Sequence, residues 1–212
     1  NQKVTAIAED TQGHIWIGTF RGLNKNNVHD YHQYFCTDDS LGLPDNQITH
    51  LLRDSKNRFW VGTVNGVCLY TDKDNFRIFP IEADNKNVRQ ILEDCNGRIF
   101  LNTGFQLYAY HPREEKITCV LPEISPGNAF YAQCHIAPDN NLWVMTSTGL
   151  RCYDPSTLQL KESVALSGYP YYSYLHNNEL WITGNHTLSI FDTRTRSFKP
   201  LPQPIARNTT LC

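Results

Sequence analysis

Histidine and carboxylate side chains are the groups in this sequence that could perform acid–base or metal chemistry. The eight histidines are dispersed, and His29 and His32, although three residues apart, fall where the sequence indicates a turn followed by a strand. A zinc site needs three or four ligands brought together, so no metal site is expected. The sequence contains no Gly-x-Ser-x-Gly elbow, P-loop or Gly-x-Gly-x-x-Gly motif. We therefore predict no catalytic residue and no cofactor.

The most unusual local composition is a tyrosine-rich segment that contains Tyr169, Tyr171, Tyr172 and Tyr174. A tyrosine offers a flat apolar face with a hydroxyl at its edge, which suits sugar rings and protein partners alike. Alternatively, alternate tyrosines belong to a strand that begins near Tyr171, and they pack in the core. A third, catalytic interpretation places His186 beside Tyr171, as a lyase or hydrolase acting on glycosides or lactones would require.

The composition excludes several classes of protein. The 212 residues have a net charge of -2 and a sequence pI near 6.5, so no basic patch for nucleic acid is expected. No apolar run reaches the roughly 20 residues of a membrane span. The seven cysteines include no Cys-x-x-Cys pair, and we interpret them as small buried hydrophobic residues, with one disulfide left open. The start at Asn1 indicates an excised piece of a longer chain.

A four-residue phrase recurs five times at a period near 40 residues. Each copy opens with an aromatic residue, and the copies are Trp16-Ile17-Gly18-Thr19, Trp60-Val61-Gly62-Thr63, Phe100-Leu101-Asn102-Thr103, Trp143-Val144-Met145-Thr146 and Trp181-Ile182-Thr183-Gly184. A period of about 40 built from short strand-like segments is typical of β-propeller blades. We expect the five aromatic residues to be structural anchors that pack between blades.

The second repeat shows the expected strands of one blade. Segments 46–54, 58–63, 67–70 and 76–79 are strand-like and are separated by polar turns. The sequence thus predicts an all-β fold, a single β-propeller array over residues 1–212 with about five four-stranded antiparallel blades. The predicted blades span 1–42, 43–84, 85–125, 126–167 and 168–204, and residues 205–212 form a tail or the start of a next blade.

The order of the strands predicts a binding face. In a propeller, the turns between second and third strands and the connections from a fourth strand to the next blade open on the same face. The ligand-binding residues predicted on this face are Arg21, Asn46, Asn65, Asn87, Tyr169, Tyr171, Tyr172 and His186. For Asn46 and Asn87, which precede first strands, the alternative is that they cap a turn locally.

The first two repeats resemble the two-component regulator propeller repeat. The resemblance rests on Leu43-Pro44-Asp45-Asn46-Gln47-Ile48, Asp54 and Arg58-Phe59-Trp60-Val61-Gly62-Thr63, and on Ile7 to Asp10 with Ile15 to Thr19. Later repeats depart from it, since Phe100 replaces Trp, Asn102 and Met145 replace Gly, and Gly184 replaces Thr. The similarity covers essentially the whole chain, strongly in its first third and weakly later.

The resemblance implies a function. Members of that family are periplasmic sensor regions of hybrid two-component histidine kinases from gut Bacteroidetes, with seven-bladed propellers, oligosaccharide ligands and control of polysaccharide-utilisation genes. For this segment the charge, the apolar pattern and the absence of catalytic motifs predict no enzymatic activity and no nucleic-acid or membrane contact. The implied partners are an oligosaccharide, the remaining blades and sensor domains of a parent chain and, as a further option, a second copy in a homodimer. A non-catalytic protein-interaction scaffold is the main alternative, and a closed ring of five blades is the alternative to a segment of a larger propeller.

Overall fold

The computed structural model describes residues 3–27, 30–37, 42–71, 74–124, 132–166, 168–185 and 187–201. Regular structure in these residues consists of five four-stranded antiparallel sheets, which confirms the predicted all-β fold and the four-stranded blades. Over the same ranges there is no helix with the length and apolar character of a membrane span. The chain divides into two compact units, Asn1–Pro122 and Glu123–Cys212, each described here by itself.

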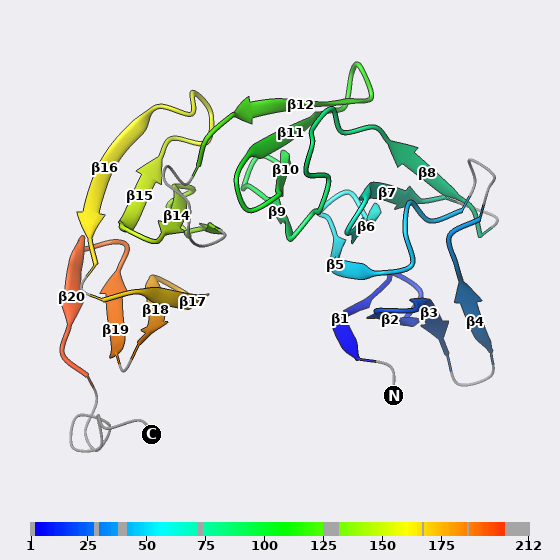
Figure 1. Cartoon of the computed structure of the whole chain (residues 1–212), viewed down its shortest axis with the longest axis horizontal. Coiled ribbons are helices and arrows are strands. Elements are labelled where there is room, and N and C mark those ends of the chain that lie inside the picture. The colour runs from blue at the N-terminus through cyan, green and yellow to red at the C-terminus, as the bar shows by residue number, and fades with distance from the viewer. Residues whose placement is uncertain are drawn as a thin grey trace. The chain divides into compact units, whose positions relative to one another are not determined.

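The first unit contains three sheets, in each of which consecutive strands of the chain lie side by side (Figure 1). The first sheet comprises β1 (Val4–Glu9), β2 (Ile15–Thr19), β3 (Gly22–Asn26) and β4 (Tyr31–Tyr34). The second comprises β5 (Ile48–Arg53), β6 (Phe59–Thr63), β7 (Gly66–Tyr70) and β8 (Phe76–Phe79). The third comprises β9 (Gln90–Glu93), β10 (Ile99–Asn102), β11 (Leu107–His111) and β12 (Lys116–Leu121).

The second unit contains two sheets with the same strand order. The fourth sheet comprises β13 (Gln133–Ile136), β14 (Leu142–Thr146), β15 (Gly149–Tyr153) and β16 (Leu160–Ala165). The fifth comprises β17 (Pro170–His176), β18 (Glu179–Gly184), β19 (Thr187–Asp192) and β20 (Ser197–Lys199). Whether the five sheets form one continuous array, as the repeat predicts, stays a prediction.

The last two residues of the repeated phrase have separate structural roles. The threonine closes the turn after the second strand, because Thr63 Oγ1 donates a hydrogen bond of 2.9 Å to the Gly66 carbonyl. Gly66 has a φ of 125°, a conformation that side chains disfavour. The glycine of the phrase lies inside the strand, where a Cβ on Gly18 would lie 2.5 Å from Ile48 Cγ2. Close packing of the first two sheets therefore requires glycine at that position.

Four of the five aromatic anchors are buried. Trp16, Trp60 and Trp143 have no exposed surface, and Phe100 is 1% exposed. Each of the three tryptophans packs on an aromatic ring of the following sheet in its own unit. The pairs are Trp16 with Phe59 at 4.7 Å between ring centroids, Trp60 with Tyr110 at 5.0 Å and Trp143 with Phe191 at 5.1 Å. Offset and edge-on aromatic pairs of this kind add to the free energy gained by burial.

Trp181 differs from the other anchors because it is only half-buried. Its indole Nε1 donates to Glu179 Oε2 at 3.3 Å within its own sheet. The register pairs Trp181 with Tyr174, and Tyr174 is 57% exposed. Among the described residues no further sheet follows the fifth one, so no ring of a following sheet covers Trp181. The expectation that Trp181 packs between two blades therefore stays a prediction.

Candidate functional site

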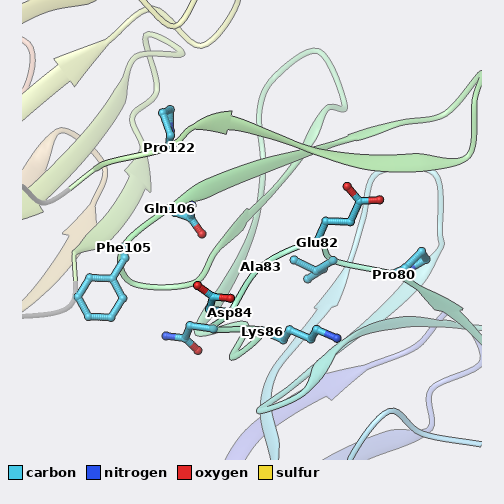
Figure 2. Close-up of a pocket in the computed structure, with 10 residues that line it drawn as sticks. Pro80, Glu82, Ala83, Asp84, Lys86, Phe105, Gln106 and Pro122 are labelled. Atoms are coloured by element: carbon cyan, nitrogen blue, oxygen red, sulfur yellow. The ribbon is translucent and has the colours of Figure 1, made fainter.

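A pocket of about 840 Å³ opens in the first unit, on the face made by the β10–β11 turn and the connection from β8 to β9 (Figure 2). The residues that line it are Pro80, Ile81, Glu82, Ala83, Asp84, Asn85, Lys86, Phe105, Gln106 and Pro122. This is the face that strand order predicts for ligand binding, and we call it the loop face. The volume lies within the range of small-molecule sites in proteins.

Burial at both ends positions the connection that forms one wall of the pocket. Phe79 is 2% exposed, Ile81 4% and Val88 0%, so these three side chains hold the ends of the segment in the core. The charged side chains between them, Glu82 and Asp84, are exposed. The sequence alternates apolar and charged residues here, and this alternation sets carboxylates at the pocket while the two ends of the connection are held in the core.

Three charged residues of the pocket have no ionic or hydrogen-bonding partner among the described residues, namely Glu82, Asp84 and Lys86. Several other carboxylates of this unit are bound within the protein. For example, Asp54 accepts hydrogen bonds from Arg58 Nε at 2.6 Å and from Trp60 Nε1 at 2.9 Å. All hydrogen-bond donors and acceptors of such charged groups are available to a ligand.

The opposite wall presents an aromatic ring and an amide. Phe105 is 41% exposed at the tip of the β10–β11 turn, which Thr103 Oγ1 closes by donating to the Gln106 carbonyl at 3.2 Å. The Tyr108 hydroxyl donates to Gln106 Oε1 at 2.8 Å, and this bond orients the amide. Burial, Cys119 and the charge of Asp84 raise the pKa of Tyr108, so the hydroxyl stays protonated as a donor.

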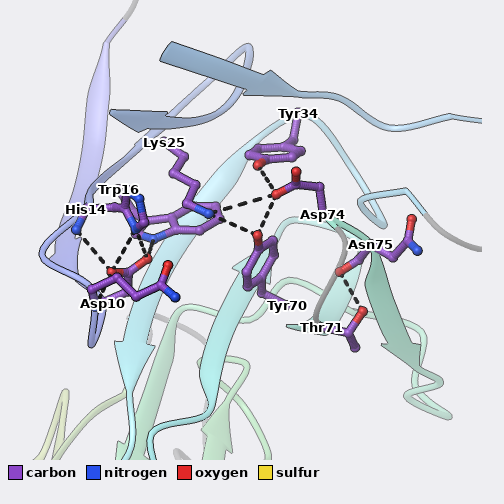
Figure 3. Close-up of polar contacts among 10 residues, drawn as sticks. Asp10, His14, Trp16, Lys25, Tyr34, Tyr70, Thr71, Asp74 and Asn75 are labelled. Carbon is purple, nitrogen blue, oxygen red and sulfur yellow. Dashed lines mark hydrogen bonds and ion pairs between the residues drawn. The ribbon is translucent and has the colours of Figure 1, made fainter. Parts of the chain in front are cut away.

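A second pocket in this unit, of about 370 Å³, lies on the opposite face, beside the β1–β2 and β7–β8 turns. Its charged groups bind one another (Figure 3). Lys25 Nζ lies 3.0 Å from the Tyr70 hydroxyl, and Asp74 Oδ1 accepts hydrogen bonds from Tyr34 at 2.7 Å and from Tyr70 at 2.5 Å. These bonds lower the pKa of Asp74. The network joins the first sheet to the second, which is a structural role.

In the second unit, a pocket of about 540 Å³ lies beside the β17–β18 and β19–β20 turns. Here both carboxylates are paired, since Lys199 Nζ lies 2.7 Å from Asp192 Oδ2 and 3.1 Å from Glu179 Oε1; Arg194, which also lines this pocket, has no side-chain partner among the described residues. The Lys199 hydrogen bond lowers the pKa of Asp192 to about 2. The pocket on the loop face of the first unit is therefore the best candidate for binding.

Arg21 and Asn65 occupy equivalent turns, in the first and second sheets. Their backbone N–H groups donate to the closing threonines, Arg21 to Thr19 Oγ1 at 3.0 Å and Asn65 to Thr63 Oγ1 at 3.2 Å. Both side chains are exposed. Neither residue lines the pocket described above, and a role for them in binding stays a prediction.

Asn46 and Asn87 both lie just before a first strand, as the sequence indicates. Asn46 Oδ1 accepts a hydrogen bond of 2.7 Å from the Cys36 N–H, so its amide ties the chain before β5 to the end of the first sheet. The Asn87 N–H donates to Asn85 Oδ1 at 3.0 Å, and its own side-chain oxygen is buried without a partner in the described region. These contacts agree with a local structural role for Asn46.

The predicted tyrosines lie in the second unit. Tyr171 and Tyr172 belong to β17 and not to a loop, because the strand begins at Pro170, which pairs with Gly184. They do not pack in the core: Tyr169 is 60% exposed, Tyr171 53% and Tyr172 58%. His186 lies outside the described residues, and so does the catalytic interpretation that pairs it with Tyr171. In the ranges described, no group of three or more His, Cys, Asp or Glu side chains could hold a metal ion.

The sequence identified the segments of the pocket but not its key residues. The β8–β9 connection and the β10–β11 turn belong to the face that strand order predicts, but Glu82, Asp84, Phe105 and Gln106 are not among the residues predicted for binding. Two features of the sequence indicate these residues. Glu82 and Asp84 form an acidic pair in a connection between blades, and Phe105 is an aromatic residue in a turn that has Arg21 and Asn65 in other repeats.

Comparison with known families and structures supports the resemblance. The family model described as two component regulator propeller matches residues 1–21 and 42–65. These are the two stretches in which the sequence resemblance is strongest. Among curated proteins, none matches the chain by sequence.

Solved structures share the fold at low sequence identity. The extracellular domain of the hybrid two-component system BT3049 from B. thetaiotaomicron superposes with a TM-score of 0.76 at 19% identity, over 94% of this chain and 30% of that one. Virginiamycin B lyase from Staphylococcus aureus gives a TM-score of 0.72 at 17% identity, over 96% and 72% of the two chains. PorZ of Porphyromonas gingivalis gives 0.65 at 17% identity, over 92% and 32%. The chain thus spans about a third of the length of the B. thetaiotaomicron structure.

Proposed function

We propose that this chain, which contains two-component regulator propeller repeats, is a ligand-binding part of the extracytoplasmic sensor region of a hybrid two-component system. Its ligand is an oligosaccharide, and the response is expression of polysaccharide-utilisation genes through the kinase of the parent protein. The periplasm is the proposed location. The remaining blades and sensor domains of the parent chain, or a second copy of it, are the proposed partners in signalling.

The observation that supports binding is the pocket on the loop face of the first unit. Sugar rings have an apolar face and a rim of hydroxyls, so they suit a site that combines an exposed aromatic ring with carboxylate and amide groups. Phe105 offers the ring, Asp84 offers hydrogen-bond acceptors, and the Gln106 amide offers donors. The proposed role is binding without turnover, so the sugar should be recovered unchanged.

The position of the pocket suggests how binding is transmitted. One wall is the connection from β8 to β9, and the other is a turn of the third sheet. A ligand held between Asp84 and Phe105 would tie this connection to the third sheet. Binding that restricts such a segment changes the equilibrium of whatever element the segment touches, and we propose this as the first step of signalling.

A thermal-shift titration against neutral plant, fungal and host oligosaccharides tests the proposal. A ligand at 100 times its dissociation constant should stabilise the fold by about 2.7 kcal/mol. Phe105→Ala should abolish the shift without lowering the melting temperature of the free protein, because the ring is already 41% exposed. Phe20→Ala is the matched control, since Phe20 is a 45% exposed ring in the equivalent turn of the first sheet. Equal shifts in both variants, or a flat panel, would contradict the proposal.

A protein-interaction scaffold is the second candidate, and one surface of the second unit favours it. Tyr172 and Tyr174 are 58% and 57% exposed on the sheet face that also bears Trp181, and exposed aromatic clusters are typical of protein interfaces. A photo-crosslinker at position 174 in the parent protein tests this. A crosslink to another polypeptide would favour the scaffold, and its absence would remove the candidate.

A further inference from the structure

We infer that the pocket on the loop face prefers glycans with a free amino group and disfavours uronic acids and sulfated sugars. The inference rests on the proposed function and adds the chemical class of the sugar. It follows from the charges that line the pocket, which are two carboxylates and one amine.

The two carboxylates are placed to meet a ligand. Glu82 and Asp84 are both exposed and have no partner within the described residues. Asp84 lies close enough to the β11 side of the pocket to act electrostatically on Tyr108, whose hydroxyl bonds Gln106. Its negative charge is therefore felt at the wall where Phe105 would hold a sugar ring.

The single cation of the pocket does not cancel this charge at the aromatic wall. In Figure 2 the amine of Lys86 extends away from Phe105 and Gln106, whereas the Asp84 carboxylate lies on their side of the connection. No ion pair joins Lys86 to either carboxylate in the region described. The part of the pocket beside Phe105 is therefore negative, and it complements a cation.

The charge of the pocket then determines the order in which cationic, neutral and anionic sugars bind. An exposed ammonium–carboxylate pair favours binding by about two- to fivefold, and Asp84 is the carboxylate on the side of Phe105 (Figure 2). A uronate or a sulfate in the same place meets like charge and binds more weakly than a neutral sugar. Because these groups face solvent, salt should screen the preference over a Debye length of about 8–10 Å.

A matched pair of trisaccharides tests the inference, namely β-1,4-linked glucosamine and the same sugar with every amine N-acetylated. Isothermal titration calorimetry measures the dissociation constants of both trisaccharides and of a glucuronate-containing trisaccharide, which is the anionic member of the set. The titrations are done at pH 6, where an amine with a pKa of about 8 is protonated. We expect the amine to bind about two- to fivefold tighter than the acetylated sugar at low salt, with the advantage reduced at 0.5 M salt. The anionic sugar should bind most weakly.

Two variants test whether the pocket carboxylates cause the preference for the amine. Glu82→Gln combined with Asp84→Asn should make the two trisaccharides bind equally, whereas Glu114→Gln, at an exposed acid outside the pocket, should leave the preference intact. Melting curves verify that each variant is folded. Binding of both sugars without a preference, or a preference for the anionic one, would overturn this inference and leave the proposed function standing. If no oligosaccharide of either panel binds, both fail together.

Discussion

At the scale of single residues, an aspartate, partly buried in the first sheet and buried in the second, satisfies the indole of the repeated tryptophan. Asp10 Oδ2 and Asp54 Oδ2 each accept a hydrogen bond of 2.9 Å from the indole N–H of Trp16 and Trp60. The other oxygen of each carboxylate accepts two backbone N–H groups of the turn between the first and second strands. One carboxylate thus orders a turn and satisfies a buried donor, which explains why the two residue types recur together.

The fourth sheet lacks this aspartate. Ala137 stands at the corresponding place, since its N–H donates to the Asn141 carbonyl at 2.9 Å as that of Asp54 donates to Arg58 at 3.0 Å. As a result, the buried Nε1 of Trp143 has no hydrogen-bond partner in the described region. An unsatisfied buried donor is destabilising.

Ala137→Asp should therefore stabilise the second unit by about 1 kcal/mol, by giving the indole N–H an acceptor. Urea unfolding of the variant and of the unaltered protein measures the difference. The control is the same substitution in a Trp143→Phe background, where no donor needs an acceptor and no gain is expected. A gain of equal size in both backgrounds would mean that the turn, and not the indole, accounts for it.

At this scale, part of the structure could be predicted from the sequence. The aromatic spacing predicted the anchors, and four of the five are buried. Trp181 is the exception because its burial depends on a following sheet, which its own neighbours in the sequence do not reveal. The residues of the pocket were not predicted for a related reason: Asp84 and Phe105 lie in different connections and meet only through the folding of the third sheet.

At the scale of the elements, a half-buried histidine joins the fourth and fifth sheets. The register sets His135 on β13 opposite Trp143. Its Nε2 lies 2.7 Å from Ser173 Oγ on β17, and that hydroxyl donates to Gln133 Oε1 at 2.9 Å. Because the serine hydrogen is used for Gln133, the serine accepts from a neutral imidazole. Burial lowers the pKa of His135 to about 4.

This histidine should make the stability of the second unit depend on pH. In the unfolded chain a histidine takes up a proton near pH 6.5, whereas His135 in the folded protein does so only at about pH 4. Between these values the unfolded state binds more protons, so stability falls as the pH falls, by at most about 1.4 kcal/mol per pH unit. Urea midpoints measured from pH 7.5 to 4 follow the change.

The variant His135→Gln keeps a side-chain donor for Ser173 and cannot titrate. The loss of stability between pH 6.5 and 4 should be smaller in this variant than in the unaltered protein. His50 in the first unit also has a pKa lowered by burial, so a pH effect should persist in part. Identical profiles for the two proteins would contradict the role assigned to His135.

At the scale of the whole molecule, the first and last described sheets each present an exposed face with large side chains. On the first sheet, Val4, Ile7 and Ile15 are 50%, 66% and 39% exposed. Ile15 occupies the position that Phe59 has in the second sheet. Phe59 packs against Trp16 of the preceding sheet. The exposed face of the first sheet is thus of the kind that accepts another sheet.

Such a face should make the isolated chain self-associate, because exposed apolar patches drive association. Sedimentation at increasing concentration should show a rising average mass. Replacing Ile7 and Ile15 by lysine should weaken the association by at least about tenfold, while Lys56→Glu, in an exposed turn, should not. A chain that stays monomeric at every concentration would contradict this expectation.

The strand order described above also has a kinetic consequence. Every pairing in the described sheets joins strands that are neighbours in the sequence, so each ladder closes through a short loop at a small entropic cost. Folding dominated by local contacts is fast, and in repeat architectures it can begin in one repeat and propagate to the next. During synthesis each sheet can therefore form soon after its fourth strand leaves the ribosome. A nascent chain that has left the ribosome as far as residue 122 would already hold three completed sheets, with one apolar core between the first and second and another between the second and third.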